Sequence, residues 1–228
     1  MTNNTAGEGS AAAAAVCIGS FVDSGSVESH RYYIARRTVI EMLGDRGYTV
    51  ANAEEELSRS LDGFRAAFGD KPDPDRLRLL AHRDSNPSRK ILVIFCEANE
   101  IRKKNMVGIL SQIMNKETLD KVILILQGNI NSHAKKVMNE CSVKVETFPI
   151  TDLLVNITKH VWMPKHEILT VEEKQMLLNK FNIEDKQLPK MLEDDAIARY
   201  YGLEKGQVVK ITYDGAITES LVAYRCVV

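Results

Sequence analysis

The spacing of apolar residues predicts two helices in the first third of the chain. Between residues 30 and 47, apolar side chains recur every three or four positions, as on one face of a helix. They are Tyr32, Ala35, Val39 and Leu43, and Gly47 follows the last turn. A second helix is predicted over residues 54–70, with a stop at Gly69. Its apolar side carries Leu57, Leu61 and Phe64. Residues 76–84 then alternate as in a strand.

The middle of the chain predicts buried strands alternating with helices. Residues 90–97, KILVIFCE, and 121–128, KVILILQG, are short continuous apolar runs, as in strands covered on both faces. Residues 101–117 between them have helical spacing. Because parallel neighbours need a crossover connection, usually a helix, these segments predict a βαβ unit. Residues 132–141 and 143–148 extend it to βαβαβ.

Beyond residue 150 the pattern changes. Thr170 and Glu173 form an S/T-x-x-E capping box at the start of a helix. A further helix, EDDAIARYYGL, has acidic residues in its first turn and Gly202 as its stop. Residues 207–213 and 221–228 alternate with period two on either side of Asp214-Gly215, a dipeptide that favours hairpin turns. This half is predicted to be a small α+β domain that ends in a strand.

These patterns divide the chain into three parts. We expect a flexible tail over residues 1–28, an α/β domain with a partly parallel sheet over residues 29–149, and the α+β domain over residues 150–228. A length of 228 residues, with 44% hydrophobic and 27% charged residues, suits two small globular domains. No run approaches the roughly 20 apolar residues that span a bilayer, which excludes a membrane-embedded protein.

Charge and cysteine usage narrow the class further. Thirty basic and 31 acidic side chains leave a formal charge of −1, so no global positive field can hold a polyanion, and any nucleic-acid contact must be local. Four scattered cysteines form no C-x-x-C pair, which is typical of free thiols in a reducing compartment. They are Cys17, Cys96, Cys141 and Cys226. The apolar stretch near the N-terminus lacks the basic region of a signal peptide.

Phosphate and metal sites find little support in the motifs. Gly202 and Gly206 flank a lysine in GLEKGQ, but a helix precedes them and a strand follows, the reverse of a phosphate loop. The segment is therefore predicted to be a helix cap and a turn. His160 and His166 lie six residues apart without a second ligand pair, so we expect surface or interface groups and no zinc.

Metal-dependent nuclease chemistry is the alternative function. Asp84 precedes the strand of residues 90–97, and Glu97-Ala98-Asn99 ends it. Asn99 takes the place of the lysine that such a site needs, so the set lacks its cation and solvated strand-end acids are favoured. The basic residues 102–104 open a predicted helix, where a solvated face is favoured over a phosphate contact. A free nucleic-acid-binding module is a third possibility. No catalytic residue and no cofactor is predicted.

Several motifs resemble the fifth shared subunit of eukaryotic nuclear RNA polymerases, whose C-terminal part corresponds to a small subunit of the archaeal polymerase. In the second half they are VNITKHVWMPKHEILTVEE, QLPK, ARYYGLEKGQVVKI and AYR. In the first half they are RRTVIEMLGDRGY, FGD, LAHRD and QGNINSHAKK, in the expected order. The resemblance covers residues 29–228.

The resemblance implies a non-catalytic subunit of a heteromeric nuclear polymerase. Its N-terminal jaw domain, with a nuclease-like fold, would lie along downstream duplex DNA, and its C-terminal assembly domain would dock on the largest subunit. Residues expected near the largest subunit are His166, Arg199, Tyr200, Tyr201, Gln207, Lys210 and Arg225. Those expected near DNA are Asn131, His133 and Lys135.

The chain also departs from that family at several positions. Asp195-Ala196 stands in place of Asp-Pro, Glu204 in place of a base, and Ser132 in place of a proline. The loop YDGAITESL replaces one that contains serine, glutamate and arginine. Because these changes reduce positive charge on the second domain, we hypothesise a divergent paralogue restricted to one polymerase class.

Overall fold

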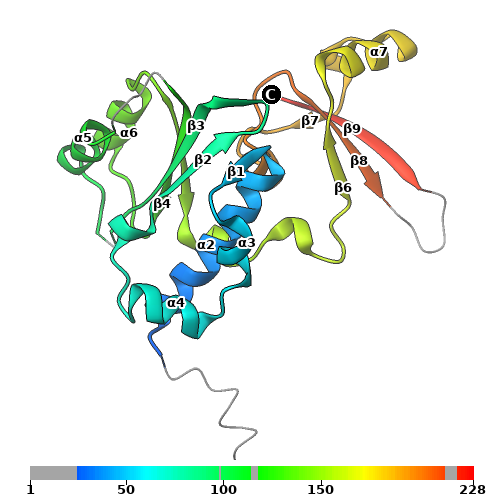
Figure 1. The fold of residues 1–228 in the computed structure, drawn as a ribbon. Helices are drawn as coiled ribbons and strands as arrows, with labels where there is room; N and C mark the ends of the chain where they lie inside the picture. Colours follow the sequence, from blue (N-terminus) through cyan, green and yellow to red (C-terminus); the bar gives the residue numbers. More distant parts are fainter. Residues whose placement is uncertain (1–24, 98, 114–117, 214–219) are drawn as a thin grey trace, which may run out of the picture.

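The computed structural model describes residues 25–97, 99–113, 118–213 and 220–228. Cys17, the Asp214-Gly215 dipeptide and most of the predicted tail lie outside the described residues. Two sheets organise the rest, one with strand order β1-β2-β3-β4-β5 and one with order β6-β8-β9-β7. Figure 1 shows the second sheet extending away from the first, with its β8–β9 pair farthest out. Among the described residues, no helix is long and apolar enough to cross a bilayer.

The first predicted helix is confirmed as α2, Val27–Asp45. It begins where the Ser26 side chain accepts a hydrogen bond from the backbone N–H of Ser29 at 3.0 Å. All four residues of its predicted apolar face are at most 1% exposed. Gly47 follows the helix with a φ of +76°, in the left-handed region that glycine adopts without strain. Amphipathic spacing therefore located this helix and its buried face.

The second predicted helix is two helices, so the prediction of one continuous helix was wrong. They are α3, Ala53–Ser58, and α4, Leu61–Phe68. Ser60 between them has an extended backbone, and its hydroxyl accepts from the N–H of Gly63 at 3.1 Å. A serine that caps a new helix interrupts the spacing pattern without erasing it. The stop at Gly69 is confirmed.

The first sheet confirms the βαβαβ prediction. Its strands are β1 (Tyr48–Val50), β2 (Leu79–Arg83), β3 (Asn86–Phe95), β4 (Leu119–Leu126) and β5 (Lys144–Pro149). Strands β3, β4 and β5 are parallel, while β1 and β2 pair antiparallel. The crossovers contain α5, Lys103–Ser111, and α6, Ser132–Asn139. The short 3-10 helix Pro74–Leu77 precedes β2.

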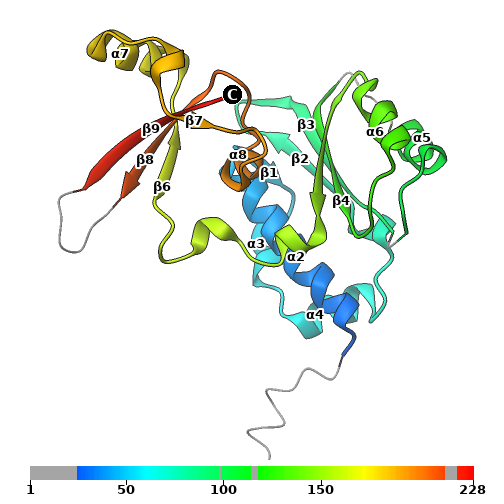
Figure 2. The same ribbon diagram turned by 180° about the vertical axis from the view of Figure 1, so that it is seen from behind.

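Helices cover both faces of this sheet, α2 on one and α5 with α6 on the other (Figures 1 and 2). Val93, Phe95 and Ile125 join the core under α2. Ile94 and Leu124 alternate with them and join the core under α5 and α6. Because each strand buries both sets of side chains, its sequence is continuously apolar instead of alternating.

The second domain is built on the smaller sheet. Its strands are β6 (Lys165–Ile168), β7 (Lys190–Met191), β8 (Val208–Tyr213) and β9 (Leu221–Val227). The predicted antiparallel pair β8–β9 is confirmed. Helix α7, Val171–Phe181, begins with the predicted capping box of Thr170 and Glu173. Strands β6 and β7 were not predicted, because two to four residues are too few to show alternation.

Two 3-10 helices, Ile150–Leu153 and Ile157–Lys159, lie between β5 and β6, and a third, Asp185–Gln187, follows α7. Helix α8 is Ala196–Tyr201. Its two neighbours in sequence are β7 and β8, yet it lies beside α2 of the first domain (Figure 2). This position makes α8 the bridge between the two halves of the molecule.

Deleting residues 221–228 is expected to unfold the second domain. The deletion removes β9, which pairs with both β8 and β7 and contributes the buried Cys226 and Val227 to two core clusters. Thermal unfolding followed by circular dichroism should show loss of one cooperative transition. Leu221→Ser is the matched control, because Leu221 is 65% exposed, and its melt should match that of the parent. A deletion variant that retained the parent's full cooperative melt would contradict this expectation.

Candidate functional site

The segment ARYYGLEKGQVVKI forms a helix end, a turn and a strand, as predicted. Asp195 caps α8 by accepting from the N–H of Ile197 at 2.9 Å. Gly202 ends α8 with a φ of +63°. A Cβ at Gly202 would lie 3.0 Å from the Arg46 guanidinium, so the position requires glycine for its backbone and for this close approach. Gly206, with a φ of +85°, donates its N–H to the Val227 carbonyl at 2.9 Å.

Tyr200 inserts into the first domain. Its side chain is 4% exposed and belongs to the core cluster under α2. Its hydroxyl donates to Asp45 Oδ2 at 2.6 Å and accepts from Asn156 Nδ2 at 3.2 Å. Burial, and then the hydrogen bond to Asp45, raise the pKa of Tyr200. This residue therefore ties α8 to α2 within one chain.

Arg46, directly after α2, binds the carboxyl end of α8. Its guanidinium donates to the carbonyl oxygens of Tyr200 and Arg199, both at 2.7 Å. The same group forms an ion pair with Glu146 Oε2 at 2.8 Å, and its side chain is only 4% exposed. Carbonyls in the last turn of a helix lack partners within the helix, and a cation there satisfies them. Arg46 thus caps α8 from another domain.

Two lysines of the first sheet extend the junction. Lys121 lies on β4, and its Nζ is 3.1 Å from Glu146 Oε1 and 3.4 Å from Glu204 Oε1. The same Nζ donates a hydrogen bond to the carbonyl oxygen of Gly202 at 3.1 Å. Lys144 on β5 lies 3.0 Å from Glu204. Burial favours a higher pKa for Glu146, but Arg46 and Lys121 outweigh it and hold the pKa below 4.5. We call Arg46, Lys121, Glu146, Tyr200 and Glu204 the interdomain junction.

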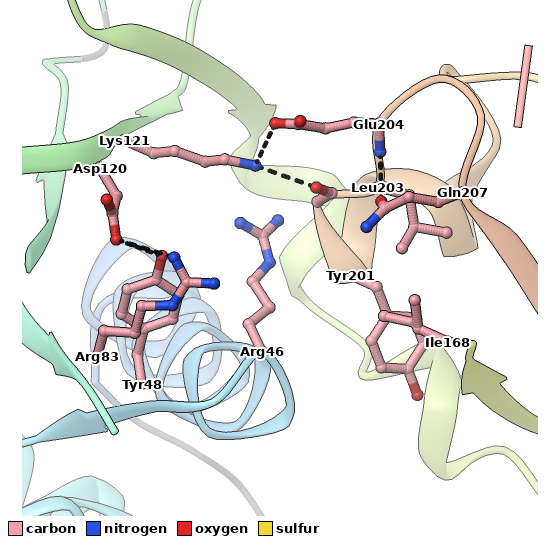
Figure 3. A pocket seen from close by; sticks show the side chains of 11 residues that line it. Arg46, Tyr48, Arg83, Asp120, Lys121, Ile168, Tyr201, Leu203, Glu204 and Gln207 are labelled. Atoms are coloured by element: carbon pink, nitrogen blue, oxygen red, sulfur yellow. Dashed lines mark hydrogen bonds and ion pairs between the residues drawn. The ribbon is translucent and has the colours of Figure 1, made fainter. Parts of the chain in front are cut away.

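A cleft of about 420 Å³ opens beside the junction, between the two domains. Figure 3 shows Arg46 and Lys121 on the first-domain side, with Tyr201 and Gln207 facing them from the second. Arg83 and Asp120 line the same cleft, and the Asp120 carboxylate pairs with Arg83 at 3.6 Å. Asp120 also accepts from the Tyr48 hydroxyl at 3.1 Å. The polar groups of this cleft are thus engaged mostly with one another.

The residues expected near a largest subunit do not form one surface. Arg199 and Tyr200 take part in contacts between the domains. Tyr201 is half-buried in the cleft, and Gln207 Oε1 accepts from the N–H of Glu204 at 2.7 Å, which closes the turn before β8.

The other three lie on the two faces of the second sheet. The pairings His166–Ile211 and Val209–Arg225 place His166 and Arg225 on the face that α8 covers. Lys210 lies on the opposite face, paired with Glu167 at 3.2 Å.

The residues expected near DNA cluster at the start of α6. Asn131 caps this helix by accepting from the N–H of His133 at 2.9 Å. His133 and Lys135 are exposed. The three residues therefore lie in or just before the first turn of α6, beyond the carboxyl ends of the parallel strands, with His133 and Lys135 on different sides of the helix.

The acids of the nuclease alternative lie far apart. Asp84 precedes β3 and Glu97 follows it, so a ten-residue strand of roughly 33 Å separates them. Asp84 accepts from the Thr49 hydroxyl at 2.6 Å. In the described part of the chain, no group of three or more histidine, cysteine, aspartate or glutamate side chains is placed to hold a metal ion. A pair at opposite ends of one strand cannot share a metal.

Sequence reasoning missed Arg46, Lys121 and Glu146. Arg46 lies within the motif RRTVIEMLGDRGY, but its partner Tyr200 is 154 positions away. No periodicity or capping signal connects residues at that separation. Lys121 is the first residue of the apolar run KVILILQG, and Glu146 interrupts the strand segment VKVETF. A charged residue beside or inside a buried strand was the one signal of a buried ion pair that the sequence offered.

Two small sheets, joined by a largely buried, ion-paired junction, define a two-domain α/β protein. The chain matches the family profiles "RNA polymerase Rpb5, N-terminal domain" over residues 26–113 and "RNA polymerase Rpb5, C-terminal domain" over residues 155–227.

Relatives match over nearly the whole chain. DNA-directed RNA polymerase V subunit 5A of Arabidopsis thaliana is 47% identical over 96% of this chain and 98% of its own. Subunit 5C of the same enzyme is 49% identical over 93% of this chain and 90% of its own length. The subunit RPABC1 of polymerases I, II and III from Caenorhabditis briggsae is 36% identical over 89% of this chain and 98% of its own length.

The chain therefore belongs to the Rpb5 family of RNA polymerase subunits, as the motifs indicated. It is a structural, non-catalytic subunit of a multi-subunit DNA-directed RNA polymerase. The nuclease alternative is not supported.

Arg46→Met is expected to lower the free energy of unfolding by about 3 kcal/mol, because it leaves two carbonyls and a mostly buried carboxylate without their cation. Chemical denaturation measures the change. In the double variant Arg46→Met/Glu146→Met the loss should be smaller than the sum of the two single losses. Arg83→Met is the control, since its side chain is 51% exposed, and should change stability by less than about 0.5 kcal/mol. Equal effects of Arg46→Met and Arg83→Met would contradict the assigned role of Arg46.

The junction should also weaken in acid. The folded state lowers the pKa of Glu146 below its ordinary value, so its stabilisation is complete above the pKa of the unfolded state and is lost as the pH falls through the folded pKa. Denaturation midpoints of the parent should therefore fall more steeply between about pH 6 and about pH 3 than those of Glu146→Gln. Parallel curves for the two proteins would refute this assignment.

Proposed function

We propose that this chain is the fifth subunit of one polymerase class related to polymerase V, rather than a subunit shared by polymerases I, II and III. The observation that supports this proposal is the order of identities. Relatives named as subunits of polymerase V, or of IV and V, are 47–49% identical to the chain. Those named as subunits of polymerases I, II and III are 32–36% identical. A nuclear location accompanies this function.

The second domain docks on the largest subunit in this proposal. The outer end of its sheet carries exposed apolar side chains, with Trp162 at 86%, Leu221 at 65% and Tyr213 at 40% exposure. Tyr213 and Leu221 are cross-strand partners on the face that also carries His166 and Arg225. Exposed aromatic side chains beside apolar ones are typical of protein interfaces. We call Trp162, Tyr213 and Leu221 the docking end.

The first domain, residues 29–149, serves as the jaw along downstream duplex DNA, and residues 150–228 form the assembly domain. Asn131, His133 and Lys135 support this role, because they lie together at the start of α6 on an exposed edge. With a net charge of −1 on the whole chain, only such a local group can approach phosphates favourably. The interdomain junction then fixes the angle between the jaw and the docking end.

Affinity purification of the tagged chain from its own cells tests this proposal. The largest subunit of one polymerase class should be recovered about tenfold more abundantly than those of polymerases I, II and III. The double variant Trp162→Ser/Leu221→Ser should lower that recovery about tenfold, because it removes two apolar anchors.

Met176→Ser provides the matched control for docking. Met176 is 63% exposed on α7, away from the docking end, and its substitution should leave recovery unchanged. Comparable recovery of the largest subunits of all three nuclear polymerases would sink the class assignment. Unchanged recovery of the double variant would instead refute the docking end alone.

A further inference from the structure

A hollow of about 740 Å³ lies at the carboxyl ends of the parallel strands β4 and β5. Residues 126–130, from the last residue of β4 onward, line it together with residues 147 and 149–151 at and beyond the end of β5. Lys135 of α6 and Arg199 of α8 also belong to its lining. The hollow therefore gathers groups from two strand-end loops and from both domains.

Three contacts position Arg199 at the edge of this hollow. Its Nη2 donates to the Thr147 carbonyl at 3.0 Å, and its Nη1 lies 3.1 Å from Asp152 Oδ2. The guanidinium lies over the Phe148 ring, 4.9 Å from the centroid. These contacts engage two of its five N–H donors and leave others for a ligand. A guanidinium fixed in this way loses little entropy when it binds an oxyanion.

The hollow offers further hydrogen-bond donors to a ligand. Lys135 forms no ion pair within residues 25–97, 99–113, 118–213 and 220–228. Asn129 and Thr151 add an amide and a hydroxyl to the lining, which contains no carboxylate. Asp152 reaches Arg199 without lining the hollow. Because Asp152 offsets the charge of Arg199, the net positive charge of the hollow comes from Lys135.

We propose that this hollow binds a compact oxyanion of the phosphate-monoester class. A phosphate group accepts directed hydrogen bonds on each oxygen, and the hollow offers it the Lys135 ammonium, unused N–H donors of Arg199 and neutral donors. A duplex backbone instead needs cations spread along successive phosphates. The phosphate can belong to a free small molecule or to a phosphorylated side chain of another protein. This inference places Arg199 with Lys135 rather than with the docking end.

Amide chemical shifts of the full-length, isotope-labelled chain test the proposal. Inorganic phosphate, a phosphoserine peptide, its unphosphorylated counterpart and a short DNA duplex are titrated separately. Phosphate and the phosphopeptide should shift residues 126–130 and 147–151, and the unphosphorylated peptide should not. Lys135→Ala should weaken binding about tenfold. Lys136→Ala, the adjacent exposed lysine that does not line the hollow, should weaken it less than about twofold.

The outcomes distinguish the two sources of the phosphate group and identify the results that overturn the proposal. Tighter binding of the phosphopeptide than of phosphate supports a phosphorylated partner, and the reverse supports a free anion. No shift at the hollow up to about 10 mM phosphate overturns the proposal, as does equal weakening by the two lysine variants. Binding of the duplex alone also overturns it. Because co-purification with a polymerase is measured separately, failure here leaves the proposed function untouched.

Discussion

The arrangement of the two domains depends on the Arg46 guanidinium. It binds two carbonyls at the end of α8 and the Glu146 carboxylate, and it is almost completely removed from water. Removing a cation from water costs several kcal/mol, and only a full set of close acceptors offsets that cost. Because Arg46 follows α2 directly and Glu146 lies on β5, the ion pair also ties the helix to its sheet. Tyr200 then packs under α2, and the second sheet follows from where α8 ends.

Glu204 gives the interdomain junction a negative charge at a position where relatives are expected to have a base. The motifs imply a base there, whereas this chain has an acid that pairs with Lys121 and Lys144 of the first sheet. The hydrogen bond from Lys144 lowers the pKa of Glu204. A base at this position would instead face two lysines. The substitution therefore acts within the molecule, where it reinforces the contact between the domains, as well as changing the outer surface.

The functions proposed for this chain are divided among surfaces on both sides of the interdomain junction. The docking end lies at the outer tip of the second sheet, and the exposed edge at the start of α6 lies on the first. The hollow at the ends of β4 and β5 lies between them, because Arg199 of α8 forms part of its wall. Arg199 of α8 is the example: the resemblance assigned it to the interface with the largest subunit, and the structure places it in the lining of the hollow.

The sequence by itself determined the local elements and the family. Spacing located α2, β3, β4, β8 and β9, and the capping residues Thr170 and Gly202 marked helix ends, because these signals act between neighbours in the chain. It could not divide α3 from α4, where one serine side chain decides. Only the tertiary structure decided that ARYYGLEKGQVVKI serves mainly as an internal junction. Its partners Asp45, Arg46 and Lys121 lie 80 or more positions away, and a contact between such distant residues exists only once the chain has folded.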